Sequence, residues 1–84
     1  MEQSSVFYVK NVEKQDDKYF VHGYGYDKER NLNYEDFFTY YHGRIDGQYL
    51  NSEEDRLSKE SIRYIRKNII DAIRDYDKQE KASL

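Results

Sequence analysis

The first part of the chain contains two runs of apolar residues with the composition of β-strands. Residues 6–13 are rich in β-branched and aromatic side chains, and residues 18–26 have the same composition. The polar segment 14–17 separates these two runs, and a second polar segment, 27–31, follows them. Two such runs joined by a short polar turn predict a β-hairpin.

The segment from Leu32 to Ile45 fits two structures. As a helix it would begin at a capping Asn33 and end at Gly43. As a strand it would use its alternating aromatic residues, and its aromatic and threonine content favours this choice. The pattern alone leaves residues 33–43 open between strand and helix.

The last third of the chain has the spacing of one amphipathic helix. A turn is predicted at Asp46-Gly47, then a short strand at 48–50 and a polar connection at 51–56. Beyond it, apolar residues recur at intervals of three and four, which is typical of one helical face. These residues are Ile62, Ile65, Ile69, Ala72, Ile73 and Tyr76.

The helix is predicted over about 59–78, with a frayed tail at 79–84. Ser58 or Ser61 can cap its start. Ile65 and Ile69 are expected at the centre of the core.

These elements predict an α+β fold in a single domain of 84 residues. A small antiparallel meander of three to four strands, over about 6–50, would carry one long C-terminal amphipathic helix on one face. Hydrophobic residues make up 37% of the chain and mean hydropathy is -1.19, so apolar material is scarce. The 17% aromatic content offsets this scarcity, because each ring can bury a large area.

Two glycines in the second strand indicate which face the helix covers. Glycine inside a strand often marks a close approach by another element. We therefore expect the helix across the face of Tyr19, Val21, Gly23 and Gly25. The opposite face would carry Phe20, His22, Tyr24 and Tyr26, and one helix cannot cover both sides.

Charge and tyrosine content together favour a protein partner. Residues 1–57 hold twelve acidic and seven basic side chains, and residues 58–84 hold five acidic and seven basic ones. An acidic sheet is poorly suited to phosphates, whereas tyrosine is enriched at protein interfaces. The expected contact residues are Phe20, Tyr24, Tyr26, Asp16, Asp17 and Asp27.

We therefore expect a small non-enzymatic protein-binding module whose partner has a basic surface. Its predicted role is that of a regulator or inhibitor, such as a phage or mobile-element accessory factor that acts on a nucleic-acid-processing enzyme.

Two alternatives involve the helix. A basic strip of Arg63, Arg66, Lys67 and Arg74 would suit a nucleic-acid-binding module, although Asp71 and Asp75 interrupt it. The isoleucine stripe also fits barely two heptads, so a weak homodimer through the helix competes with a monomer.

No motif indicates catalysis, a cofactor or a metal. Cysteine is absent, and His22 and His42 lie in aromatic contexts that suit structural roles. The run Glu53-Glu54-Asp55 lacks the ligand spacing of a calcium loop. Because a secreted domain this small would usually carry disulfides, the absence of cysteine favours a cytoplasmic location. Neither an export signal nor an apolar run long enough to span a membrane is evident.

Overall fold

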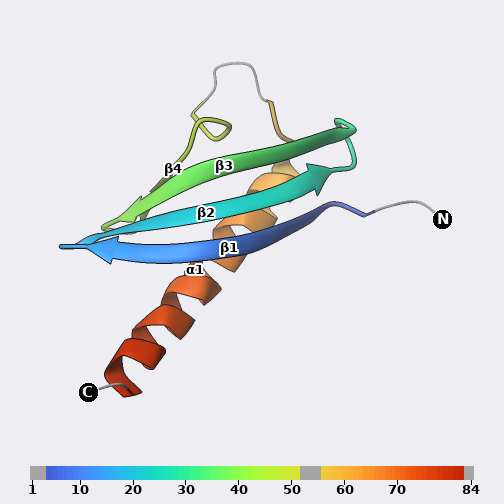
Figure 1. Ribbon diagram of the computed structural model, residues 1–84. Helices are drawn as coiled ribbons and strands as arrows, with labels where there is room; N and C mark the ends of the chain where they lie inside the picture. The colour runs from blue at the N-terminus through green and yellow to red at the C-terminus, as the bar shows by residue number, and fades with distance from the viewer. Residues whose placement is uncertain (1–3, 52–55, 83–84) are drawn as a thin grey trace.

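The fold is an antiparallel meander with one helix packed across it. The computed structural model describes residues 4–51 and 56–82. Its strands are β1 (Val6–Gln15), β2 (Lys18–Asp27), β3 (Leu32–Tyr41) and β4 (Arg44–Asp46), and its helix is α1 (Lys59–Ala82). The strands pair in chain order, and α1 lies on one side of the sheet only (Figure 1). The predicted α+β meander is confirmed.

Tight turns fix the register of the strands. Gln15 pairs with Lys18, which leaves Asp16 and Asp17 as a two-residue loop. His42 and Gly43 join β3 to β4 with φ angles of 49° and 80°. Two successive positive φ angles are characteristic of a type I′ turn, whose twist matches that of the flanking strands.

Residues 33–43 form most of β3 and the turn that follows it. The strand interpretation of this segment is therefore confirmed, and the helical one is wrong. The prediction of a strand at 48–50 is wrong. Because the turn at His42-Gly43 reverses the chain early, β4 forms at Arg44–Asp46 instead. Residues 48–50 form a turn, in which the N–H groups of Leu50 and Asn51 donate to the Gly47 carbonyl at 3.1 and 3.0 Å.

The covered face of the sheet contains a layer of interlocked rings. Phe7 of β1 and Tyr34 of β3 stack with their centroids 6.2 Å apart. A Cβ atom on Gly23 would lie 2.3 Å from the Phe7 ring, and one on Gly25 would lie 2.6 Å from the Tyr34 hydroxyl. The glycines therefore admit these two rings against the backbone of β2, and α1 packs over the resulting layer.

The helix begins where expected and ends later. Ser58 is its N-cap, since its hydroxyl accepts from the N–H of Ser61 at 3.3 Å. The predicted end at residue 78 and the frayed tail at 79–84 are corrected, because α1 continues to Ala82. The lysine, glutamine and glutamate residues of this segment are good helix formers. Residues 83–84 lie outside the described part of the chain.

Two side-chain contacts hold α1 against the strands beside its apolar stripe. Asn68 donates from Nδ2 to the Phe7 carbonyl at 2.8 Å, and the Tyr19 hydroxyl donates to both carboxylate oxygens of Asp77, at 2.8 and 3.0 Å. Burial and this bond raise the pKa of Tyr19 to about 12. The stripe itself buries Ile65, Ile69 and Ile73.

A buried carboxylate joins the sheet to the start of the helix. Asp27, at the end of β2, is fully buried. Its Oδ2 accepts from the N–H of Ser58 at 2.6 Å, and its Oδ1 accepts from the N–H of Arg30 at 3.0 Å. Burial alone would raise the pKa of Asp27, but the hydrogen bonds donated by Ser58, Arg30 and Ser61 hold it below its usual range.

We expect Ile69→Ala to cost about 2–5 kcal/mol in the free energy of unfolding, because the side chain is fully buried between α1 and the sheet. Urea unfolding monitored by circular dichroism measures this cost. Ile70→Ala, one residue along and partly exposed, is the matched control and should cost well under half as much. Equal costs would show that α1 is not packed as described.

The Asp27 carboxylate also predicts a pH dependence of stability. Its pKa is lower in the folded than in the unfolded protein, so its contribution is complete above about pH 4 and is lost as the pH falls. Asp27→Asn should reduce stability at pH 7 by about 1–3 kcal/mol and flatten the dependence between pH 5 and 2. Asp17→Asn, at the exposed hairpin turn, should preserve the parent profile, and a flattening in that variant instead would contradict the assignment.

Candidate functional site

The sheet has an open face, on the side away from α1. Because side chains alternate along each strand, the pairing of the strands determines its members. The open face comprises Val6, Tyr8, Lys10, Asn11, Glu13 and Gln15 of β1; Lys18, Phe20, His22, Tyr24 and Tyr26 of β2; Asn33, Glu35, Phe37, Thr39 and Tyr41 of β3; and Arg44 and Asp46 of β4.

Exposed aromatic rings cover three adjacent strands of this face. The most exposed is Phe37, at 72% of its surface, and its ring stacks on His22 at 4.3 Å between centroids. Tyr8 of β1 and Tyr24 of β2 are paired across the two strands, and their ring centroids lie 5.5 Å apart. Phe20 and Tyr41 add exposed rings toward the β1–β2 hairpin end of the sheet.

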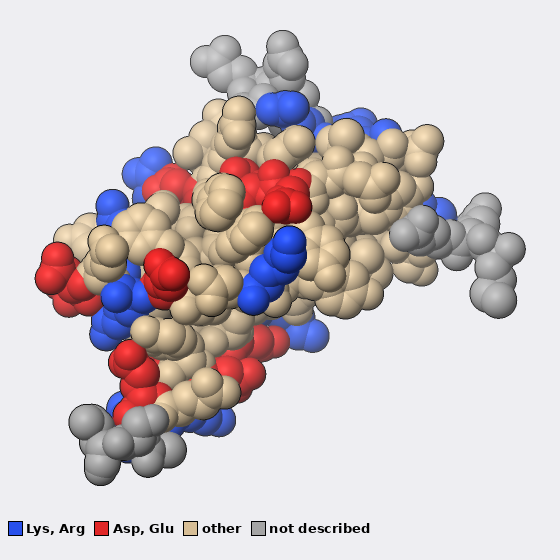
Figure 2. Space-filling view, viewed as in Figure 1, with Lys and Arg blue, Asp and Glu red and all other residues tan. Residues whose placement is uncertain are grey.

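The charged side chains of the open face carry both signs. Figure 2, which views this face, shows red and blue atoms scattered over a largely uncharged surface. The ammonium group of Lys10 lies 5.6 Å from the centre of the Tyr24 ring. At this distance the positive charge is attracted to the face of the ring. Arg44 pairs with Asp46 at 3.0 Å.

Near the middle of the face, Glu35 pairs with a histidine. Its Oε1 lies 2.8 Å from Nε2 of His22. The hydrogen bond with His22, aided by the charge of Lys10, holds the pKa of Glu35 below its usual range. A carboxylate therefore remains charged at the centre of the aromatic surface.

The structure places most of the predicted contact residues on or beside the open face. Phe20 and Tyr24 are exposed there, and Tyr26 is half-buried with its hydroxyl donating to Asn31 at 2.7 Å. Asp16 and Asp17 are exposed at the β1–β2 turn.

Asp27 is a correction to the predicted set. It was expected on an acidic turn beside the open face, but it lies on the covered face with no exposed surface. Asp27 is buried because its carboxylate accepts hydrogen bonds from the backbone N–H groups of Arg30 and Ser58.

Three rings of the open face were missing from the sequence-based set. Tyr8, Phe37 and Tyr41 become neighbours of the predicted residues only through the strand register. The pair Phe37-Phe38 was a usable signal, because consecutive residues of a strand point to opposite faces. Once Phe38 is assigned to the core, Phe37 must be outside.

The four residues of the predicted basic strip are all exposed on α1. Arg66 also lines a groove between α1 and β4. Asp71 and Asp75 are also exposed on the helix.

Within the described ranges 4–51 and 56–82, no group of three or more histidine and acidic residues could hold a metal ion. The acidic run 53–55 lies outside those ranges. The helix of the structure is not long and apolar enough to cross a membrane.

No protein-family model, curated protein or solved structure matches this chain. The candidate site therefore stands on its geometry and chemistry alone.

Proposed function

We propose that this protein is a binding module that docks another protein on the open face of its sheet and thereby regulates or inhibits that partner. The observation that carries the proposal is the set of five exposed rings on three adjacent strands: Tyr8, Phe20, Tyr24, Phe37 and Tyr41. Exposed aromatic rings gathered on one face of a small domain are typical of an interaction site.

The chemistry of these rings suits a protein interface. Tyrosine and phenylalanine offer large contact areas on stiff side chains, and such residues dominate the energetics of interfaces. The rings are further held in place by stacking, as between His22 and Phe37, and by the rigid strands beneath them. Little conformational freedom is then lost on binding, which favours affinity.

The charges of the open face narrow the kind of partner. Carboxylates at Glu13, Glu35 and Asp46 stand beside the cations of Lys10, Lys18 and Arg44. Such a surface complements an apolar patch that carries charges of both signs, with a cation opposite the central Glu35. A basic patch on the partner would find its complement at the exposed Asp16-Asp17 turn.

The same charges disfavour the competing nucleic-acid function. Stacking of bases on exposed rings occurs in single-strand binding proteins, but there a positive groove follows the phosphates. Here the central Glu35 is anionic and the whole chain has a net charge of -3. The exposed cations of α1 are interrupted by Asp71 and Asp75, which weakens the case for that surface as well.

The test compares capture of partners by the parent and by Tyr24→Ala/Phe37→Ala, with each immobilised in an extract of the host and the bound proteins quantified by mass spectrometry. Truncated anchor residues typically cost 2 kcal/mol or more, so the authentic partner should bind the double variant roughly thirtyfold less tightly. Circular dichroism should show an unchanged fold, because both side chains are exposed.

Tyr64→Ala is the matched control, since it removes an exposed ring from α1 and not from the sheet. It should retain the partner. Undiminished capture by the folded double variant would contradict the proposal, as would a parent protein that binds DNA or RNA at physiological salt and loses that binding in Arg63→Glu/Arg66→Glu/Lys67→Glu.

A further inference from the structure

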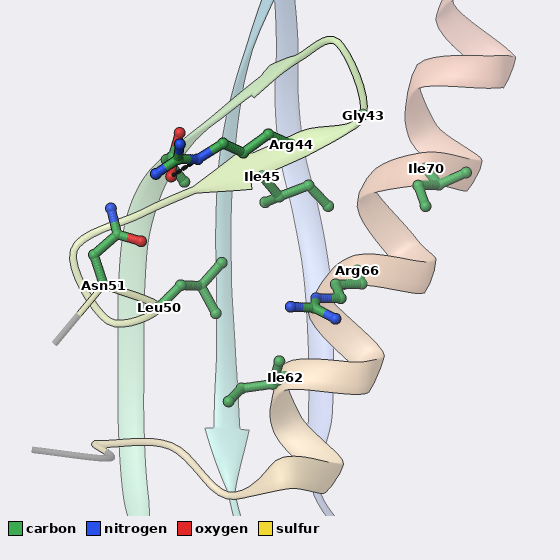
Figure 3. A pocket seen from close by; sticks show the side chains of 9 residues that line it. Gly43, Arg44, Ile45, Leu50, Asn51, Ile62, Arg66 and Ile70 are labelled. Atoms are coloured by element: carbon green, nitrogen blue, oxygen red, sulfur yellow. Dashed lines mark hydrogen bonds and ion pairs between the residues drawn. The ribbon is translucent and has the colours of Figure 1, made fainter. Parts of the chain in front are cut away.

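A concave surface lies on the covered side of the sheet, between α1 and the short edge strand β4. The helix packs against β1 and β2, so it leaves a groove of about 530 Å³ on the side of β4. That volume is within the range of ordinary ligand sites. Figure 3 shows this groove, with the helix as one wall and β4 with the 47–51 turn as the other.

Aliphatic side chains line both walls of the groove, together with the polar residues Arg44, Asp46 and Asn51. Ile45 of β4 and Leu50 of the 47–51 turn lie on one side, and Ile62 and Ile70 of α1 lie on the other. Ile70 is 37% exposed although it is an aliphatic residue in the middle of a helix. The isoleucine that falls outside the regular stripe of α1 therefore belongs to this groove.

The guanidinium group of Arg66 extends into the groove. Arg66 lies between Ile62 and Ile70 on the same line of α1, and in Figure 3 its side chain points across the groove toward Leu50. It forms no ion pair with any described residue. Arg44 and Asp46 of β4 also line the groove, but they are paired with each other at 3.0 Å. An arginine framed by aliphatic side chains favours a carboxylate, which it can bind through two hydrogen bonds.

The neighbouring edge strand adds a backbone element to the site. β4 pairs with β3 on one side and is the last strand of the sheet. Its outer edge can therefore accept an extended peptide by backbone hydrogen bonding. In a strand added there, every second side chain would point to the same side of the sheet as Ile45, which is the side of the groove.

We propose that the groove between β4 and α1 binds an extended segment of a partner protein in which an apolar residue and an acidic residue stand two positions apart. The apolar side chain occupies the space between Ile45, Leu50 and Ile62, and the carboxylate pairs with Arg66. This site is separate from the open face, so it does not depend on the function proposed for that face.

The spacing of the two ligand side chains follows from the strand geometry. Residues at positions i and i+2 of an extended chain project to one side, whereas adjacent residues project to opposite sides. A segment with adjacent apolar and acidic residues can place only one of them in the groove. Exposed Arg63 and Lys67 nearby on α1 give the surroundings a positive potential, which favours an acidic ligand.

The experiment titrates the protein with acetyl-Thr-Leu-Thr-Glu-Thr-amide and follows the isoleucine methyl signals by NMR. Ile45, Ile62 and Ile70 should shift, and the buried Ile73 should not. Replacing the glutamate of the peptide by glutamine, or moving it next to the leucine, should weaken binding at least fivefold. Arg66→Gln should weaken binding of the glutamate peptide about tenfold and abolish its advantage over the glutamine peptide.

Arg63→Gln is the matched control, because it removes a neighbouring exposed cation that does not line the groove. It should leave the preference for glutamate intact. The proposal is overturned if Arg66→Gln retains that preference, or if the peptide shifts only signals of the open-face rings. The proposal is also overturned if the peptide does not bind at millimolar concentration, or if inorganic phosphate or octanoate binds as tightly as the peptide. Shifts that depend on protein concentration in the absence of peptide would show that a second copy of the chain occupies the groove, and they would overturn it too.

Discussion

The scarcity of apolar side chains constrains this protein to one core. Its buried residues are contributed by the strands, by Leu57 and by three isoleucines of α1, and all of them meet on one side of the sheet. A single helix can shield a single face, so the opposite face must meet solvent or a partner. The aromatic residues are divided accordingly: Phe7, Tyr34 and Phe38 are buried, whereas Phe37, Tyr8 and Tyr24 are exposed.

The packing on the covered side explains two further features. The rings of Phe7 and Tyr34 lie against the backbone of Gly23 and Gly25, and this flat layer receives the helix. The helix α1 contacts β1 and β2. The hydrogen bond from the N–H of Ser58 to Asp27 fixes the start of α1 at the C-terminal end of β2. Since the helix follows these two strands, β4 is left beside a groove.

The sequence pattern predicted the class of fold, the first hairpin, the helix and the division of β2 into a covered and an open face. Each of these depends on local periodicity, which hydrophobic spacing reports directly. Three features escaped it, of which the first depends on a local turn and the other two on tertiary contacts. The position of β4 follows from the positive φ angles of His42 and Gly43, the burial of Asp27 depends on the distant N–H of Ser58, and the exposure of Phe37 depends on which of two adjacent phenylalanines faces the helix.

The two faces offer surfaces of different character, which suits a module that contacts a partner at more than one point. The open face is broad and aromatic, with charges of both signs. The groove combines four aliphatic side chains with Arg66 and with the paired Arg44 and Asp46. Both surfaces meet at β4, whose Arg44 and Asp46 pair with open-face residues of β3 and also line the groove with Ile45.

The most direct test of this division compares two adjacent residues of β3. Phe38 has no exposed surface and Phe37 has 72% of its surface exposed. The free energy of unfolding, measured by urea denaturation, should fall by about 3–5 kcal/mol or more in Phe38→Ala and by less than about 1 kcal/mol in Phe37→Ala. Comparable losses in the two variants would contradict the one-sided core and, with it, the assignment of the open face as a surface available for binding.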